Sequence, residues 1–176
     1  MDGRLWLLCG LSFAGKSTLA LAIANESGAT INSLDAINEQ RGVGFGGDGL
    51  SPSVWGETLE IALERLDAAL ARHEDVIIDD TCCFRWLRDR YREVAERHAC
   101  EVLLVHIEVP LAEIQRRRRQ NDASNDRRAI RDEIFDQHLA TFEWPDPDEG
   151  AVRFTPDDEL AAWLARYATQ QRPSAS

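Results

Sequence analysis

The sequence predicts an α/β fold in which short buried strands alternate with helices. Apolar runs rich in β-branched residues recur along the 176 residues, separated by longer stretches in which apolar side chains follow helical spacing. The first run, 5–9, leads directly into a glycine-bounded loop, and residues rich in helix formers follow that loop. Such a strand–loop–helix order is typical of folds built on a parallel sheet.

Residues 10–17, the phosphate loop, read GLSFAGKS and fit the pattern G-x-x-x-x-G-K-[ST]. The glycines allow a tight turn, and the free N–H groups of the first helical turn point at a bound anion. Lys16 would reach the β- and γ-phosphates of a nucleotide, and the Ser17 hydroxyl would bind Mg²⁺. The predicted nucleotide-binding residues are Gly10, Ser12, Phe13, Ala14, Gly15, Lys16, Ser17 and Thr18.

Length and composition argue against several classes of protein. The length suits one domain over 1–171 with a frayed tail at 172–176, and no apolar run approaches the roughly 20 residues of a membrane span. The net charge of −11 opposes a polyanion such as nucleic acid and suits a neutral or cationic small molecule.

The four cysteines form no C-x-x-C and the four histidines are scattered, so we expect no zinc site. The chain starts straight into a strand without a signal peptide, and we expect a cytoplasmic location.

Asp35 follows the second expected strand. A helix over 18–26 ends before Gly28, and 29–32 reads as a short strand. Ligands of an open parallel sheet bind outside the carboxyl ends of its strands, so Asp35 should lie where a substrate binds. Further along, residues 41–50 contain five glycines and predict either a mobile loop near the site or an ordinary surface loop.

Two carboxylates end the third expected strand. A helix capped by Ser51, with Pro52 at its first position, leads to the β-branched run 76–78. Asp79 and Asp80 follow that run, in the manner of a Walker-B strand. One of them would hold Mg²⁺, directly or through water, or would orient the acceptor.

An amphipathic helix is expected over 84–99, followed by a buried strand over 101–109. The helix has an apolar side, and we expect most of its four arginines, at 85, 88, 90 and 92, to face solvent. His106 lies inside the strand and is interpreted as a hydrogen-bonded sheet histidine rather than a general base.

The stretch 111–141 predicts a basic helical lid. A helix over 111–120 ends in four arginines, 116–119, a polar break covers 121–126, and a second helix starts at about Arg127. Arginine forks of such a lid stabilise charge on a transferring phosphoryl group, and the alternative is a solvated charge run. A last strand over 151–155 and a closing helix over 157–170 complete the chain.

Four motifs resemble the small P-loop kinases, the group that includes polynucleotide 5′-kinases, chloramphenicol phosphotransferases and, more distantly, zeta-type toxins. The motifs are GLSFAGKST at 10–18, INSLD ending at Asp35, IIDDT at 77–81, and the basic lid followed by FEWPDPDE at 142–149. The resemblance implies a nucleoside-monophosphate-kinase-like fold, a five-stranded parallel sheet of order 2-3-1-4-5 with helices on both faces. It also implies ATP as phosphoryl donor and Mg²⁺ as metal.

The resemblance also implies residue roles. Asp35 matches the aspartate that takes the proton from the acceptor hydroxyl, and Asp80 with Thr81 matches a pair at the acceptor site. Arg116, Arg119 and Arg127 match lid arginines that contact phosphates. Polynucleotide kinases of this group have an arginine close after the base, whereas here the nearest one is Arg41.

The function expected from the sequence is an ATP-dependent kinase that phosphorylates a hydroxyl of a small molecule. A polynucleotide 5′-hydroxyl kinase is the first alternative, and a basic channel on the surface would favour it. The second is an ATPase or nucleotide-dependent switch that acts with a protein partner. The guanine-reading pattern N-K-x-D is absent from the sequence, which argues against a GTP switch.

Overall fold

A computed structural model of the chain describes residues 3–44, 50–124 and 130–169. The glycine-rich residues 45–49, the lid residues 125–129 and the tail from 170 lie outside this description. The elements are, in chain order, β1 (Arg4–Cys9), α1 (Lys16–Ser27), β2 (Thr30–Ser33), α2 (Leu34–Arg41), α3 (Pro52–Leu70), β3 (Val76–Asp79), α4 (Arg85–Arg97), β4 (Glu101–Ile107), α5 (Leu111–Ser124), α6 (Asp132–Thr141), the 3₁₀ helix η1 (Pro147–Glu149), β5 (Val152–Phe154) and α7 (Leu160–Tyr167).

The strands form one parallel five-stranded sheet in the order β2-β3-β1-β4-β5, which confirms the expected fold. The central strand β1 pairs Leu5 with Val76 of β3 and with Val102 of β4. Its residues after Arg4 are all buried, because helices cover both faces and each side chain enters one of two cores. All five carboxyl ends therefore lie at one edge of the sheet.

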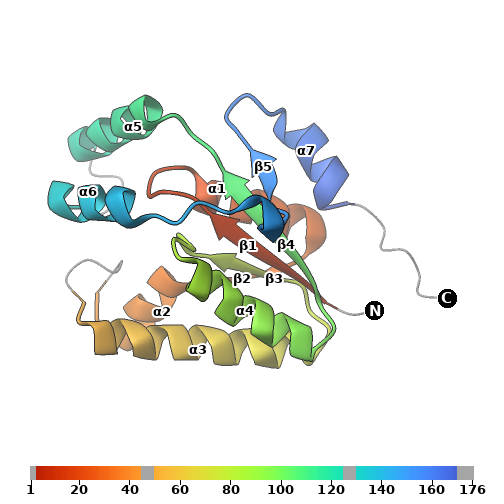
Figure 1. Cartoon of the computed structure of the whole chain (residues 1–176). Coiled ribbons are helices and arrows are strands. Elements are labelled where there is room, and N and C mark those ends of the chain that lie inside the picture. The colour runs from red at the N-terminus through yellow and green to blue at the C-terminus, as the bar shows by residue number, and fades with distance from the viewer. Residues whose placement is uncertain (1–2, 45–49, 125–129, 170–176) are drawn as a thin grey trace.

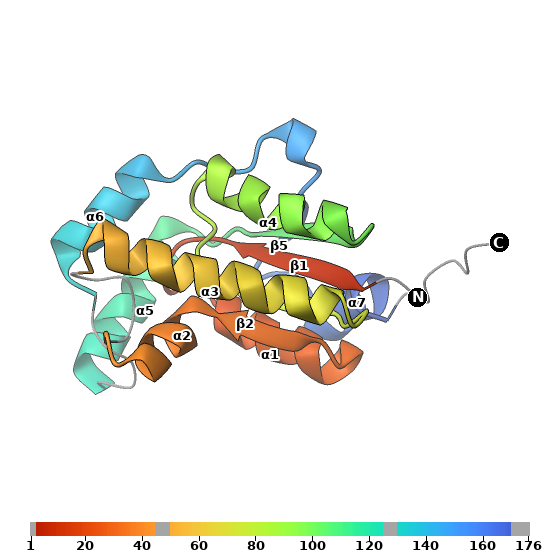
Figure 2. The same ribbon diagram turned by 90° about the horizontal axis from the view of Figure 1, so that it is seen from below.

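Alternation of side chains along the strands separates the two cores. Leu5 and Leu7 join the core under α3 and α4, whereas Trp6 and Leu8 join the core under α1 and α7. On β3, Ile78 joins the core under α3 and α4, and Ile77 joins the core under α1 and α7. The helices thus form two layers around the sheet (Figures 1 and 2).

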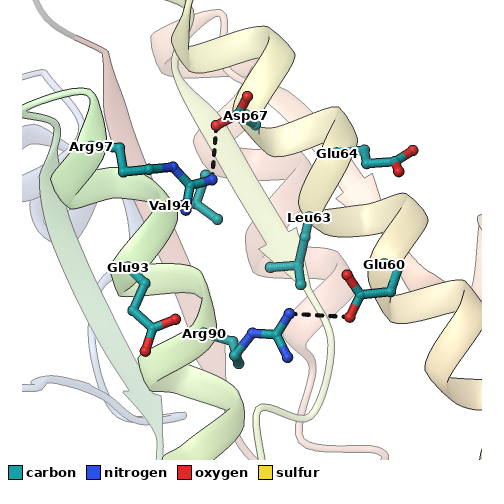
Figure 3. Close-up of a pocket in the computed structure, with 8 residues that line it drawn as sticks. All are labelled: Glu60, Leu63, Glu64, Asp67, Arg90, Glu93, Val94 and Arg97. Atoms are coloured by element: carbon teal, nitrogen blue, oxygen red, sulfur yellow. Dashed lines mark hydrogen bonds and ion pairs between the residues drawn. The ribbon is translucent and has the colours of Figure 1, made fainter.

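Two ion pairs fasten the middle of α3 to α4. Arg90 of α4 contacts Glu60 of α3 at 3.1 Å, and Arg97 contacts Asp67 at 2.9 Å. A surface groove of about 260 Å³ lies between the pairs (Figure 3) and is lined by Glu60, Leu63, Glu64, Asp67, Arg90, Glu93, Val94 and Arg97. The groove contains none of the predicted site residues.

The helices α5 and α6 lie at the end of the molecule where the phosphate loop leaves β1 (Figure 1). The expected break at 121–126 is wrong for its first four residues, because α5 continues to Ser124. Arg118 of α5 pairs with Asp132 of α6 at 2.5 Å and stacks on Phe135 at 4.1 Å from the ring centre, which fixes α6 against α5. In the part of the chain that is described, no helix is long and apolar enough to cross a membrane.

Candidate active site

The phosphate loop has the conformation that its motif predicts. Phe13 and Gly15 have positive φ angles of 67° and 101°, so the chain turns sharply before α1 begins at Lys16. No side chain caps this helix, and the N–H groups of its first turn stay available for an anion. The loop brings together Gly10, Ser12, Phe13, Ala14, Gly15, Lys16 and Ser17, while the side chain of Thr18 is exposed.

Gly10 is required by close packing. A Cβ atom added there would lie 3.0 Å from the carbonyl oxygen of Ile107 and 3.3 Å from its Cβ. The Gly10 amide donates to the carbonyl of Thr81 at 3.2 Å, so the phosphate loop is joined directly to the segment after β3.

Lys16 bends back over the loop. Its Nζ donates to the carbonyls of Gly10 at 3.1 Å and Leu11 at 2.9 Å. Burial lowers the pKa of the Lys16 ammonium, and the charges of Asp79 and Asp80 oppose that shift. The predicted phosphate-binding lysine and the two strand-end carboxylates therefore lie within electrostatic range of one another.

Asp79 and Asp80 leave β3 towards different faces. Asp79, the last residue of β3, continues the side of Ile77, which packs in the core under α1. Asp80 is the next residue, and its charge contributes, after burial itself, to the raised pKa of the buried Tyr91 phenol on α4. Burial also raises the pKa of Asp80, and its Oδ2 has no hydrogen-bond partner among the described residues.

Asp35 lies in the first turn of α2, directly after β2. Ser33 caps this helix by accepting a hydrogen bond from the Ala36 amide at 3.4 Å. The Asp35 charge contributes to the raised pKa of Asp80, behind the effect of burial, so the two carboxylates are electrostatic neighbours. The structure thus brings together Asp35 and Asp80 at the carboxyl ends of two paired strands.

Arg41, at the end of α2, is engaged by α3. Its guanidinium donates to the Val54 carbonyl at 2.8 Å and to the Thr58 hydroxyl at 2.5 Å, and it pairs with Glu57. The Thr58 hydroxyl in turn donates to Asn38 at 2.5 Å. These contacts fasten α2 to α3 and leave Arg41 bound within the protein.

The lid arginines divide into exposed and inward-facing residues. Arg116 pairs with Glu113 at 2.7 Å on the surface of α5, and Arg119 is also exposed. Arg117 was not predicted as a site residue, yet its Nη1 donates to the carbonyls of Phe13 and Ala14, both at 3.1 Å. Arg127 lies outside the described residues.

The α4 arginines divide evenly: the side chains of Arg85 and Arg90 are 43% and 42% exposed, as expected, whereas the expectation is wrong for Arg88 and Arg92. Arg88 is fully buried and binds Glu149 at 2.6 Å, and Arg92 binds the same carboxylate at 2.8 Å. Arg85 pairs with Asp148 at 2.8 Å. The acidic segment 142–149 supplies these partners, because it folds back over the start of α4.

His106 also departs from expectation. Its Nε2 is buried without a hydrogen-bond partner among the described residues, so the ring is not the satisfied sheet histidine that the sequence suggested. The ring packs against Trp144 with 5.3 Å between centres. Burial lowers the pKa of His106, because the charged form of the ring loses hydration in this contact.

A magnesium ion would fit the donor groups at this edge together with nucleotide phosphates. Among the residues that are described, no group of three or more histidine, cysteine or acidic side chains is arranged to hold a metal. Mg²⁺ usually takes one or two carboxylates, waters and substrate phosphates rather than a full protein cage. The Ser17 hydroxyl and the Asp79 carboxylate, on the α1 side, supply such a partial set.

Comparison with known proteins gives a family and a fold. The model of the AAA domain family matches residues 5–145. A sugar kinase from a Janibacter species is 23% identical over 93% of this chain and 91% of its own, with a TM-score of 0.67. The APS kinase of Mycobacterium tuberculosis, in complex with AMPPNP and APS, is 18% identical over 94% and 95%, with a TM-score of 0.67. A gluconokinase from Sinorhizobium meliloti is 22% identical over 95% and 94%, with a TM-score of 0.62.

These structural likenesses identify the fold as that of P-loop kinases. A comparison with curated protein sequences gives no significant match.

Proposed function

The chain belongs to the AAA domain family of P-loop proteins, and on this premise we propose that it is an ATP-dependent kinase acting on a hydroxyl group of a small molecule. One observation supports this most strongly. The phosphate-loop lysine, Lys16, shares one edge of the sheet with Asp35, Asp79 and Asp80, and their charges influence one another. Phosphoryl transfer needs this combination of phosphate cradle, metal ligand and acceptor carboxylate.

In this proposal β1 and α1 form the binding site for ATP, the phosphoryl donor. Lys16 turns from the loop carbonyls to the β- and γ-phosphates of ATP, and the amides of the first turn of α1 bind the same anion. Ser17 and Asp79 would hold Mg²⁺, which when bound supplies charge neutralisation between the β- and γ-phosphates. Asp79 is preferred to Asp80 because strand alternation places it on the side of Ile77, which packs in the core under α1.

The acceptor end is built by α2 and by the residues after β3. Asp35 orients the acceptor hydroxyl and takes its proton, a role in which positioned carboxylates contribute about 10²- to 10⁴-fold. Asp80 and Thr81 would bind other polar groups of the same acceptor. The Oδ2 atom of Asp80 has no hydrogen-bond partner among the described residues, which leaves it for a polar group of the acceptor.

The lid would supply positive charge over the reacting phosphates. Arg117 already reaches the phosphate loop, and Arg116, Arg119 and Arg127 remain proposed contacts of the closed site. Guanidinium groups bind phosphoryl oxygens in fixed geometry and stabilise charge that develops during transfer.

The acceptor we propose is a sugar-like metabolite or an antibiotic. Two of the structural relatives are described as a sugar kinase and a gluconokinase, and the net charge of −11 opposes polyanionic acceptors. Arg41, the arginine nearest after Asp35, is bound to Glu57 and Val54, which further disfavours a nucleic acid phosphate as its ligand.

The test is transfer of label from [γ-³²P]ATP, with Mg²⁺, to a panel of hydroxylated small molecules and to a 5′-hydroxyl oligonucleotide. We expect label on a small molecule and none in a Lys16→Ala variant. Label on the oligonucleotide alone would replace the proposal by a polynucleotide kinase. Free phosphate alone, at a rate that no acceptor changes, would replace it by an ATPase or switch.

A further inference from the structure

Three successive carbonyls hold the acceptor segment, residues 81–83, to the phosphate loop, to the acidic segment 142–149 and to α4. The carbonyl of Thr81 accepts from the Gly10 amide at 3.2 Å, and that of Cys83 accepts from the Glu143 amide at 2.8 Å. The middle carbonyl, of Cys82, accepts from Nη1 of Arg88 at 2.9 Å and, as a weaker and longer bond, from the Cys9 thiol at 3.5 Å. Cys82 has a φ of 45°, a left-handed conformation that is uncommon for residues with a side chain, so the turn depends on being held.

Arg88 is itself held by Glu149. Its Nε and Nη2 donate to the two carboxylate oxygens at 2.8 and 2.6 Å, and both side chains are only 1% exposed. The planar guanidinium has its donors in a fixed fork. Once Glu149 binds one edge of the fork, the direction of Nη1 is set, and it points at the carbonyls of Cys82 and Glu143.

We propose that Arg88 is a positioning residue for the acceptor side of the site, and that Glu149 aims it. Through the Cys82 carbonyl, Arg88 fixes the acceptor segment, and with it Thr81 and the preceding Asp80, at one distance from the phosphate loop. The inference rests on the proposed function in one respect, the assignment of Asp80 and Thr81 to the acceptor. An ion pair that merely joined α4 to the acidic segment would not need the bond to Cys82.

Stability and positioning can be separated by two variants. Arg88→Met alone leaves the buried Glu149 with Arg92 as its remaining ion-pair partner and should lower stability. The double variant Arg88→Met with Glu149→Met replaces the buried pair by apolar groups of similar size, which often restores stability. Arg92 can then rely on Asp89, which it already contacts at 2.8 Å. We expect the double variant to keep the fold while it lacks the bond from Arg88 to Cys82.

The matched control is Arg92→Met. Arg92 binds the same carboxylate, Glu149, but its ion pairs among the described residues are with Glu149 and Asp89 rather than with the acceptor segment, and its side chain is 25% exposed. This variant removes an ion pair of α4 without touching residues 81–83. We expect it to lose some thermal stability and to keep wild-type exchange and transfer.

Three readouts are compared in all variants, namely thermal unfolding, affinity for mant-ADP with Mg²⁺, and amide hydrogen exchange of residues 79–84. In the double variant we expect near-normal unfolding, nucleotide affinity within about threefold of wild type, and exchange of 79–84 faster by about tenfold or more. For the acceptor identified by the labelling panel, kcat/KM should fall by about 30- to 100-fold, the loss typical of a misplacement of about 1 Å.

Wild-type exchange of 79–84 in the double variant would overturn the inference, and so would recovery of acceptor kcat/KM together with stability. An equal fall in acceptor kcat/KM for Arg92→Met would mean that Arg88 only stabilises the fold and does not position the acceptor segment. The exchange measurement needs no acceptor, so it tests the positioning role even if wild type phosphorylates nothing in the panel. Failure of the proposed function and failure of this inference are therefore distinguishable.

Discussion

Replacing Arg117 by methionine should weaken nucleotide binding far more than the same change at the neighbouring Arg116. Both side chains pair with Glu113, at 2.8 and 2.7 Å, but only Arg117 also binds the carbonyls of Phe13 and Ala14, each at 3.1 Å. Phe13 has a φ of 67°, a conformation that costs energy for a residue with a side chain. We infer that Arg117 helps to keep the phosphate loop in its binding conformation.

The magnitude follows from those two hydrogen bonds. Hydrogen bonds to charged groups contribute about 1.5–3 kcal/mol each when well buried. The Arg117 side chain is 31% exposed, so we take about 1 kcal/mol for each bond, or roughly 2 kcal/mol together. If loss of these two bonds destabilises the binding conformation of the phosphate loop by about 2 kcal/mol, the affinity for nucleotide falls by up to about 30-fold.

The assay is a fluorescence titration with mant-ADP and Mg²⁺. The diphosphate is used so that contacts of Arg117 with a γ-phosphate do not enter the comparison. We expect an increase in Kd of about 10- to 30-fold for Arg117→Met and less than about threefold for Arg116→Met, whose side chain is 53% exposed. Equal Kd values for the two variants would refute the reasoning.

Three further predictions concern single carboxylates and one phenol. Asp35→Asn should retain mant-ADP binding and lower phosphoryl transfer by about 10²-fold, and near-normal transfer would remove Asp35 as the base. Burial alone would raise the pKa of Glu149, but hydrogen bonds from Arg88 and Arg92 outweigh it and hold that pKa at about 2. The stability that Glu149 provides is therefore complete above about pH 5 and is lost as pH falls towards 2. In Glu149→Gln the free energy of unfolding, measured with urea, should depend less on pH across that range. The same pH dependence as in wild type would contradict this. Tyr91→Phe removes a buried hydroxyl that has no partner among the described residues, so stability should stay equal or rise by up to about 1 kcal/mol, and a loss of that size in urea unfolding would show that the hydroxyl is bonded, for example to water.

Local patterns in the sequence were enough to predict where the main residues of the candidate site lie in the fold. The phosphate-loop motif fixes the turn between β1 and α1, since its glycines and its helix start act within a few residues. The strand-end rule placed Asp35, Asp79 and Asp80 at one edge once the strands were located. The sheet order came from the resemblance to small P-loop kinases, and the observed order β2-β3-β1-β4-β5 confirms it.

Local sequence patterns could not predict contacts between segments that are far apart in the chain. Arg88 meets Glu149 across 61 residues, and Arg117 meets Phe13 across 104, so neither pairing leaves a periodic signal. Within the run 116–119 each residue turns by about 100° on the helix, and only the packing of α5 decides which arginine faces the loop. The helix also runs on through Asn121, whose side chain is buried, although asparagine is a weak helix former.

The most direct test of the account is the stoichiometry of one reaction, measured as ADP formed against acceptor phosphorylated. A kinase with the proposed site should give one phosphorylated acceptor for each ADP, and Lys16→Ala should abolish both products together. ADP formed in equal amounts with and without acceptor, balanced by free phosphate, would contradict the account.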